Sequence, residues 1–218
     1  MVSEIMLVDQ PINKWLHRGD PVGETPLPMN FDFPVPMIEA LKQAYRVPSR
    51  AYHSWSHVEE VARWIQQVPS WRQPREVMLA ALFHDAVYVP SAKDNEERSA
   101  GLALELIPRF LPDADAARVA ALVRLTARHG TLTPADVDTD AALFLDCDMA
   151  ILGAAPDAFD RYDAGIREEY CAVPSVLYAL GRKRFLKRLL DTPRIYLSDF
   201  FHARLDAAAR ANVRRALS

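Results

Sequence analysis

The feature that most constrains this chain is an apolar run that ends in a histidine and an aspartate. Seven consecutive apolar residues, Val77–Phe83, lead directly into His84 and Asp85. A helix that is apolar on every side belongs inside a protein core, and this run is far too short to cross a bilayer. Burying an ionised carboxylate without a partner is costly, or changes its pKa until it becomes neutral. The sequence therefore predicts a cation, a hydrogen-bond network or a metal ion beside this pair.

The rest of the chain favours helices separated by prolines. Glycine occurs 7 times and proline 16 times in 218 residues, and half of the residues are apolar. A chain of this length can bury one sizeable core. Because apolar residues recur at helical spacing and no alternating strand pattern is found, we expect an all-α fold, a single-domain helical bundle.

We expect two parts along the chain. Residues 1–36 should form a proline-rich N-terminal arm that packs on a helical domain of residues 37–218, with at most one short helix in the arm, near residues 12–17. Ser56 followed by Glu59 predicts a capping box where the second helix of the domain begins, near Trp55. The first predicted helices cover residues 37–45, a stretch from about residue 55, and a stretch from residue 74 that ends at Val89-Pro90. Further helices are predicted over residues 94–110, from 113 or 115 to about 129, and over 134–153, 156–170, about 174–190 and 199–217.

Composition and charge argue against several classes of partner. The net charge of −3 gives no reason to expect a nucleic-acid or membrane partner. Residues 181–190 carry five cations, but a single basic amphipathic helix is best interpreted as a solvated face. Cys147 and Cys171 show no disulfide or CxxC spacing and are expected to be buried thiols. With no signal-peptide pattern at the N-terminus, we expect a cytoplasmic protein. The sequence leaves a homo-oligomer open.

Three polar clusters lie on predicted core-facing helices. His53 and His57 are four residues apart and would share a helix face, and Asp146-Cys-Asp148 lies within an apolar helix. A single buried histidine is more often a satisfied core residue, so the argument depends on the three clusters together. Two histidines and two aspartates that converge would make a nitrogen and oxygen site for a divalent ion, with open positions for water. The residues alone do not decide between His53 and His57, or between Asp146 and Asp148.

Four blocks of the sequence carry these polar residues. They are, in order, Arg50-Ala-Tyr-His-Ser-Trp-Ser-His57, Phe83-His-Asp-Ala-Val-Tyr88, Asp94-Asn-Glu-Glu-Arg-Ser-Ala100 and Phe144-Leu-Asp-Cys-Asp-Met-Ala-Ile-Leu-Gly153. Together they resemble the HD superfamily of metal-dependent phosphohydrolases, whose pattern is a histidine, a His-Asp doublet and a distant aspartate, all on helices. The blocks look in particular like one subfamily of predicted HD hydrolases, and the resemblance runs from about Leu41 to Gly153, more loosely to the C-terminus.

The resemblance implies a metal site within residues 50–153, followed by C-terminal helices over 156–217. Asp148 is preferred to Asp146 because related sequences place the ligand at the second aspartate of such a pattern. The implied cofactor is one divalent metal ion (Mn, Fe, Co, Ni or Mg), which would activate a water that attacks a phosphate ester. The implied substrate is a small phosphorylated molecule, with nucleotides among the candidates. The implied metal ligands are His57, His84, Asp85 and Asp148.

Six further residues are expected to serve the reaction. Glu96 and His129 are the expected catalytic helpers, Arg50 and Arg128 the expected phosphate contacts, and His53 and Asn95 further substrate contacts. Four of the six have a plainer alternative, which is an ion pair for the two arginines, a solvated helix position for Glu96 and a loop-fixing amide for Asn95. Two other functions remain open at this point: a di-iron oxygenase on the same scaffold, and a non-catalytic module that binds a nucleotide.

Overall fold

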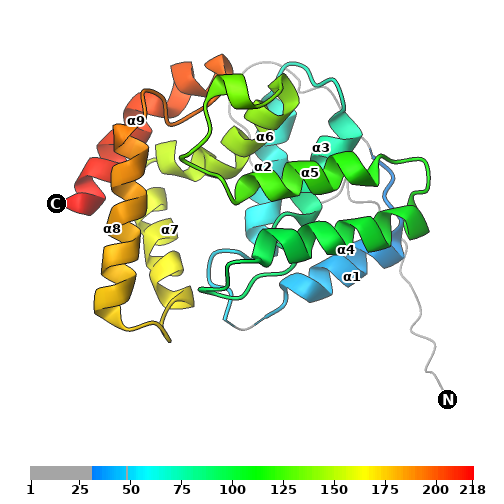
Figure 1. The fold of residues 1–218 in the computed structure, drawn as a ribbon, viewed down its shortest axis with the longest axis horizontal. Helices are drawn as coiled ribbons and strands as arrows, with labels where there is room; N and C mark the ends of the chain where they lie inside the picture. The colour runs from blue at the N-terminus through cyan, green and yellow to red at the C-terminus, as the bar shows by residue number, and fades with distance from the viewer. Residues whose placement is uncertain (1–30, 48) are drawn as a thin grey trace.

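Helices make up the regular structure of the described chain, which in this computed structural model comprises residues 31–47 and 49–218 (Figure 1). The prediction of an all-α fold is confirmed. The helices are, in chain order, α1 (Val35–Tyr45), α2 (Trp55–Gln67), α3 (Pro74–Phe83), α4 (Asn95–Phe110), α5 (Ala116–Thr126), the 3-10 helix η2 (Pro134–Asp136), α6 (Thr139–Met149), the 3-10 helix η3 (Ala150–Gly153), α7 (Pro156–Glu169), α8 (Ser175–Asp191) and α9 (Asp199–Leu217).

The apolar run forms the central helix, as expected. Every residue of Val77–Phe83 is buried. Helix α3 begins with Pro74 in its first turn and contacts α2, α4, α5 and α6 (Figure 1). A helix enclosed by four others has no face left for water, which explains why no polar residue interrupts the run.

Helix α3 ends at Phe83, so the prediction that it continues to Val89-Pro90 is wrong. Its last backbone bond runs from the His84 N–H to the Ala80 carbonyl at 2.9 Å. The next residues leave the helix because side chains from α4 bind their backbone. Ser99 Oγ binds both the N–H and the carbonyl of Val87, at 3.0 and 3.1 Å. These contacts satisfy buried backbone groups that a helix would otherwise have paired.

Helix α2 begins at Trp55, as predicted, but its cap differs. The residue that precedes α2 is Ser54, whose Oγ lies 2.9 Å from Ser56 Oγ and makes no cap bond, so the capping box at Ser56 and Glu59 is wrong. Two helix boundaries also differ from the prediction. The helix predicted from Pro134 is divided into η2 and α6, because Asp138 caps α6 by accepting the Ala141 N–H at 2.9 Å. Helix α5 ends at Thr126, three residues before the predicted end near His129.

The prediction that both cysteines are buried is wrong for Cys171, which is exposed. Cys147 is buried, as expected.

Most of the predicted N-terminal arm lies outside the described residues, including the short helix expected near residues 12–17. In the described part, Phe33 is buried and α1 begins at Val35, with a proline in its first turn.

At the other end of the chain, α9 packs on η3. Gly153 permits this close approach, since a Cβ atom there would lie 2.7 Å from the Cβ of Leu205. No helix within the described ranges is long and apolar enough to span a membrane.

The burial of α3 leads to a stability prediction. Leu79→Ala should lower the free energy of unfolding by about 2–5 kcal/mol, because Leu79 is fully buried and a cavity would remain. The same substitution at Leu104 of α4, which is 41% exposed, should cost less than about 1 kcal/mol. Urea denaturation of both variants measures the difference. Equal losses would contradict the central position of α3.

Candidate metal centre

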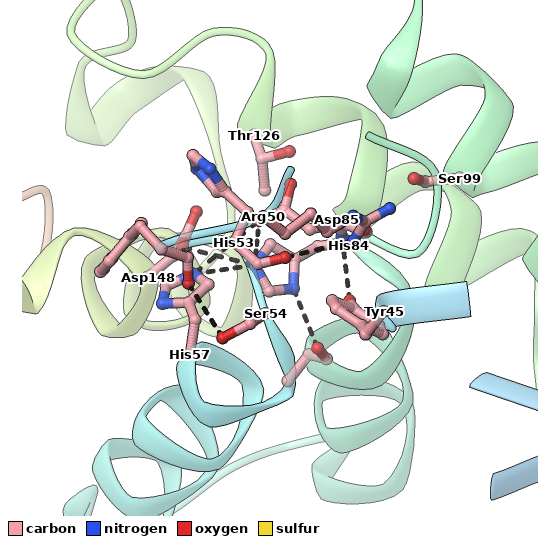
Figure 2. Close-up of polar contacts among 12 residues, drawn as sticks. Tyr45, Arg50, His53, Ser54, His57, His84, Asp85, Ser99, Thr126 and Asp148 are labelled. Carbon is pink, nitrogen blue, oxygen red and sulfur yellow. Dashed lines mark hydrogen bonds and ion pairs between the residues drawn. The ribbon is translucent and has the colours of Figure 1, made fainter. Parts of the chain in front are cut away.

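Three side chains from two helices converge in the core and form a group that could hold a metal ion (Figure 2). His57 comes from the first turn of α2, and His84 and Asp85 directly follow α3. One ligand atom from each lies within 4.8 Å of the other two. His57 Nε2 is 3.2 Å from His84 Nε2, and Asp85 Oδ2 is 3.1 Å from His84 Nε2 and 3.9 Å from His57 Nε2. Both histidines are buried, while the side chain of Asp85 is 15% exposed.

These spacings fit the edges of a coordination polyhedron. With metal–ligand bonds of about 2.1 Å, neighbouring ligand atoms lie about 3.0 Å apart in an octahedron and about 3.4 Å apart in a tetrahedron. The separation of 3.2 Å between the two Nε2 atoms falls between these values. The donor set of imidazole nitrogen and carboxylate oxygen suits a borderline or hard divalent ion.

Asp148, the fourth predicted ligand, adjoins the group from the end of α6. Its Oδ1 lies 2.9 Å from His57 Nε2 and 3.5 Å from His84 Nε2, although Asp148 is not part of the 4.8 Å group. Its Oδ2 lies 2.8 Å from His129 Nε2. His129, predicted as a catalytic helper, therefore contacts a predicted ligand and orients its carboxylate.

The two histidines of the group, His57 and His84, differ in the surroundings of their Nδ1 atoms. His84 Nδ1 lies 2.9 Å from the Ala81 carbonyl, an acceptor, so Nδ1 carries the hydrogen and Nε2 faces the group. His57 Nδ1 is buried and has no hydrogen-bond partner among the described residues. The His57 ring packs instead against Tyr52, with ring centroids 4.7 Å apart. The orientation of His57 is thus fixed by this packing and by the contacts of its Nε2, since Nδ1 contributes no hydrogen bond.

Opposite charges stabilise one another inside the group. Burial lowers the pKa of His84, but the charges of Asp85 and Asp148 and their hydrogen bonds outweigh burial and raise it well above its ordinary value. Burial likewise opposes ionisation of Asp85 and Asp148, yet the His84 charge beside them holds both pKa values below the usual range. In metal-free protein, His84 is therefore protonated between the two carboxylates. A metal ion would compete with this proton for the lone pair of His84 Nε2.

Asp146 and Asp148 have different partners in the structure. Asp146 accepts the Leu197 N–H at 2.7 Å, the Ser198 N–H at 2.7 Å and the Ser198 hydroxyl at 2.6 Å. Burial raises the pKa of Asp146 to about 6, although these donors favour its charged form. Asp146 thus fixes the start of α9, whereas Asp148 faces the histidines. The geometry is consistent with the choice of Asp148 as the ligand.

His53, the rival of His57, lies beside the group and is bound to another carboxylate. Its Nδ1 is 2.6 Å from Oε2 of Glu169, the last residue of α7. Burial lowers the pKa of His53, but the charge of Asp85 and the hydrogen bond to Glu169 outweigh burial and raise that pKa above its ordinary value. Glu169 was not among the residues that the sequence pattern indicated. The available signal was the inward stripe of α7, because Glu169 follows the buried Ile166 by three residues.

Two predicted substrate contacts are instead used to hold the loop after α3. The Arg50 guanidinium donates to the carbonyls of Asp85 at 2.6 Å, Ala86 at 3.1 Å and His53 at 3.2 Å, and it lies over the rings of Tyr45 and Tyr88. Asn95 binds both the N–H and the carbonyl of Val89 at 2.9 Å. These bonds occupy the groups that would have met a phosphate. For Asn95, the loop-fixing alternative matches the geometry.

The structure does not bring the two remaining candidates to the group. Glu96 lies partly exposed in the first turn of α4, and no hydrogen bond or ion pair joins its side chain to another described residue. Arg128 is exposed after α5 and lines a pocket with His129 and Asp146. None of the four predicted ligands lines that pocket. The expected roles of Glu96 and Arg128 therefore gain no support from their positions.

Comparisons of the chain with protein-family models, with curated proteins and with solved structures gave no match.

The contrast between the two aspartates can be tested by parallel substitution. Asp146→Ala should lower the free energy of unfolding by about 2–4 kcal/mol, because it leaves buried donors at the start of α9 without an acceptor, but should still bind metal when folded. Asp148→Ala should weaken metal binding at least about tenfold. Urea denaturation and titration with Mn²⁺ measure the two effects. The reverse pattern would make Asp146 the ligand.

Metal affinity should depend on pH because a proton competes for His84. Below the raised pKa of His84, metal binding must displace one proton. The apparent metal affinity should therefore fall about tenfold for each unit by which the pH is lowered. Above that pKa the affinity should level off. Calorimetric titration at pH 7 in two buffers with different ionisation enthalpies should show release of about one proton. Metal binding without proton release would contradict the assigned state of His84.

Proposed function

We propose that this chain is a metal-dependent phosphohydrolase of the HD type that cleaves a phosphate ester of a small molecule. The observation that supports the proposal is the convergence of His57, His84 and Asp85, with Asp148 beside them, on an all-α scaffold. These residues occur in the order of the HD pattern that the sequence resembles. The Nε2 atoms of both histidines face one another at 3.2 Å with two carboxylates around them, which is the arrangement that a divalent ion would need.

His57, His84, Asp85 and Asp148 would hold one divalent ion, and the chemistry of the donors is compatible with Mn, Fe, Co, Ni or Mg. When bound, such an ion lowers the pKa of a coordinated water and draws charge from a phosphoryl oxygen. Four protein ligands leave positions free for water and substrate in an octahedral site.

The surrounding residues would prepare this site for hydrolysis. His129 would hold Asp148 in place through the contact of 2.8 Å between its Nε2 and Oδ2. Arg50 and Tyr45 would keep the His-Asp doublet fixed, since Arg50 binds the Asp85 carbonyl and the Asp85 N–H donates to the Tyr45 hydroxyl at 3.3 Å. Such support keeps the ligands from reorienting during the reaction.

The alternative of a di-iron oxygenase has less support. A second ion needs further ligands, and the described residues contain one compact group of three or more potential ligands, His57 with His84 and Asp85. The nearest other histidines, His53 and His129, are each bound to a carboxylate. A non-catalytic nucleotide-binding module is also disfavoured, because such a module would have no reason to retain a complete set of ligands.

The proposal is tested by metal analysis and by a substrate screen. Purified protein should carry about one divalent ion per chain and should hydrolyse at least one compound of a panel of small phosphate esters. Asp85→Ala should lose both the ion and the activity, because the carboxylate of Asp85 belongs to the three-ligand group, while it keeps most of its helical circular dichroism. Elemental analysis and phosphate release measure these outcomes, with His84→Ala as a second variant that should behave in the same way.

Other results would contradict the proposal in distinct ways. Two irons per chain with turnover that requires oxygen would indicate the oxygenase. Metal without turnover, combined with tight nucleotide binding, would indicate the module. No bound metal even after addition of Mn²⁺ or Mg²⁺ would leave a buried polar cluster and no metal centre.

A further inference from the structure

A pocket lies beside the metal centre, where three parts of the chain meet. Its wall is formed by the segment after α5, by the C-terminal half of α6 and by the segment between α8 and α9. His129 belongs to this wall, and its Nε2 contacts Asp148 at 2.8 Å on the side of the metal centre. The proposed hydrolysis uses no other residue of this wall. The pocket is therefore a second place at which a ligand could bind.

Arg194 lines this pocket and has an unused hydrogen-bonding edge. Its Nε and Nη2 atoms are buried, and neither has a hydrogen-bond partner among the described residues. The remaining nitrogen, Nη1, lies 2.8 Å from Oδ1 of Asp199. Nε and Nη2 lie on one side of the planar guanidinium, so together they can donate to a single anionic group. Buried donors without an acceptor are destabilising, and an anion in the pocket would supply the acceptor.

Two other arginines of the chain show what this edge binds. Arg124 directs Nε and Nη2 at the two carboxylate oxygens of Glu97, both at 2.7 Å. Arg182 directs the same two nitrogens at Asp163 Oδ1, at 2.9 and 2.6 Å. In both cases the chain itself provides the anion. For Arg194 the described part of the chain provides none, which leaves the edge to a ligand from outside.

Further positive charge lies at the pocket. Arg128 lines it, and no hydrogen bond or ion pair joins the Arg128 side chain to another described residue. Arg188 of α8 packs against Gly130, which also lines the pocket, because a Cβ atom on Gly130 would lie 3.7 Å from Arg188 Cδ. Gly130 has a φ of +70°, a conformation that glycine adopts without strain. Three cationic side chains are thus gathered at or beside the pocket.

The one acidic side chain of the pocket wall, Asp146, is directed to other partners. Its Oδ1 accepts the Leu197 N–H, and its Oδ2 accepts the N–H and the hydroxyl of Ser198. Both oxygens are therefore engaged at the start of α9 and do not pair with Arg194. The pocket combines uncompensated guanidinium groups with a carboxylate whose charge is already stabilised by three donors.

We propose that this pocket binds a phosphate group, with the Nε and Nη2 edge of Arg194 as its bidentate contact and Arg128 as a second cation. Phosphate fits better than carboxylate because it has more oxygens and carries up to two negative charges, which two guanidinium groups can share. Inorganic phosphate and the phosphate of a monoester have this chemistry in common. The site is separate from the predicted metal ligands and requires no hydrolysis.

Phosphate binding can be followed at Arg194 itself. Inorganic phosphate, titrated into nitrogen-15-labelled full-length protein after chelation of metal, should shift the Nε–H signal of Arg194 until one phosphate per chain is bound. A parallel titration with glycerol 3-phosphate tells whether a free phosphate or a monoester binds more tightly. Acetate should bind at least about tenfold more weakly, because its two oxygens can occupy the edge of only one guanidinium.

Arg194→Lys separates the bidentate edge from positive charge alone. Lysine keeps the charge but has no planar edge, so the Kd for inorganic phosphate should rise at least about tenfold. The variant should fold, since the ion-pair partner of Arg194 is Asp199, whose side chain is 97% exposed. Arg128→Gln, at an exposed position, should also raise the Kd. The matched control is Arg124→Lys, which should change the Kd less than about twofold because the edge of Arg124 already binds Glu97.

Four results would overturn the phosphate site. They are the absence of saturable phosphate binding, saturation without a shift of the Arg194 signal, equal weakening by Arg194→Lys and Arg124→Lys, and acetate binding as tight as phosphate binding. The outcome is independent of the proposed hydrolysis. A protein that binds phosphate at Arg194 but holds no metal would keep this site and lose the proposed function, and a metal-loaded phosphohydrolase without phosphate at Arg194 would do the reverse.

Discussion

The structure depends on the burial of ionisable groups at the end of a helix that has no polar face. Helix α3 carries His84 into the core and places Asp85, whose side chain is 15% exposed, beside it, so each of their charges must be balanced by protein. Asp148, at the end of α6, balances the charge of His84 and also contacts His57 of α2. The positions of α2, α3 and α6 are therefore linked through the metal centre as well as through apolar packing.

The same constraint explains the loop after α3. Once the chain leaves the helix, its backbone groups lie in the core and must be bonded by other parts of the protein. Tyr45, Arg50, Asn95 and Ser99 provide these bonds from α1, from the loop before α2 and from α4. Polar residues that the sequence alone associates with substrate thus serve to keep the doublet in place. A loop held by four side chains gives the ligands a fixed geometry, which metal sites need.

Local patterns predicted the helices well because apolar spacing reflects which face of a helix is buried. The same patterns placed the end of α3 at Val89-Pro90, since nothing in the segment itself shows that Ser99 and Asn95 bind its backbone. The contacts of Arg50 could not be predicted for a similar reason. An arginine that packs against backbone carbonyls and one that binds phosphate have the same neighbours in sequence, and only the tertiary structure separates them. The convergence of His57, His84 and Asp85 was predictable because each ends or begins a helix with a strong inward face.

Glu169 shows that the site extends beyond the region whose sequence suggested it. The blocks that resemble HD proteins end at Gly153, yet a carboxylate on α7 holds the segment that leads to His57. A charge at an inward position of an amphipathic helix is costly unless it has partners, so its presence there is itself evidence of a specific contact. Asp146 makes the complementary connection, from α6 to the start of α9. The C-terminal helices are therefore integral to the candidate site, because α7 positions His53 while α9 is anchored two residues from Asp148.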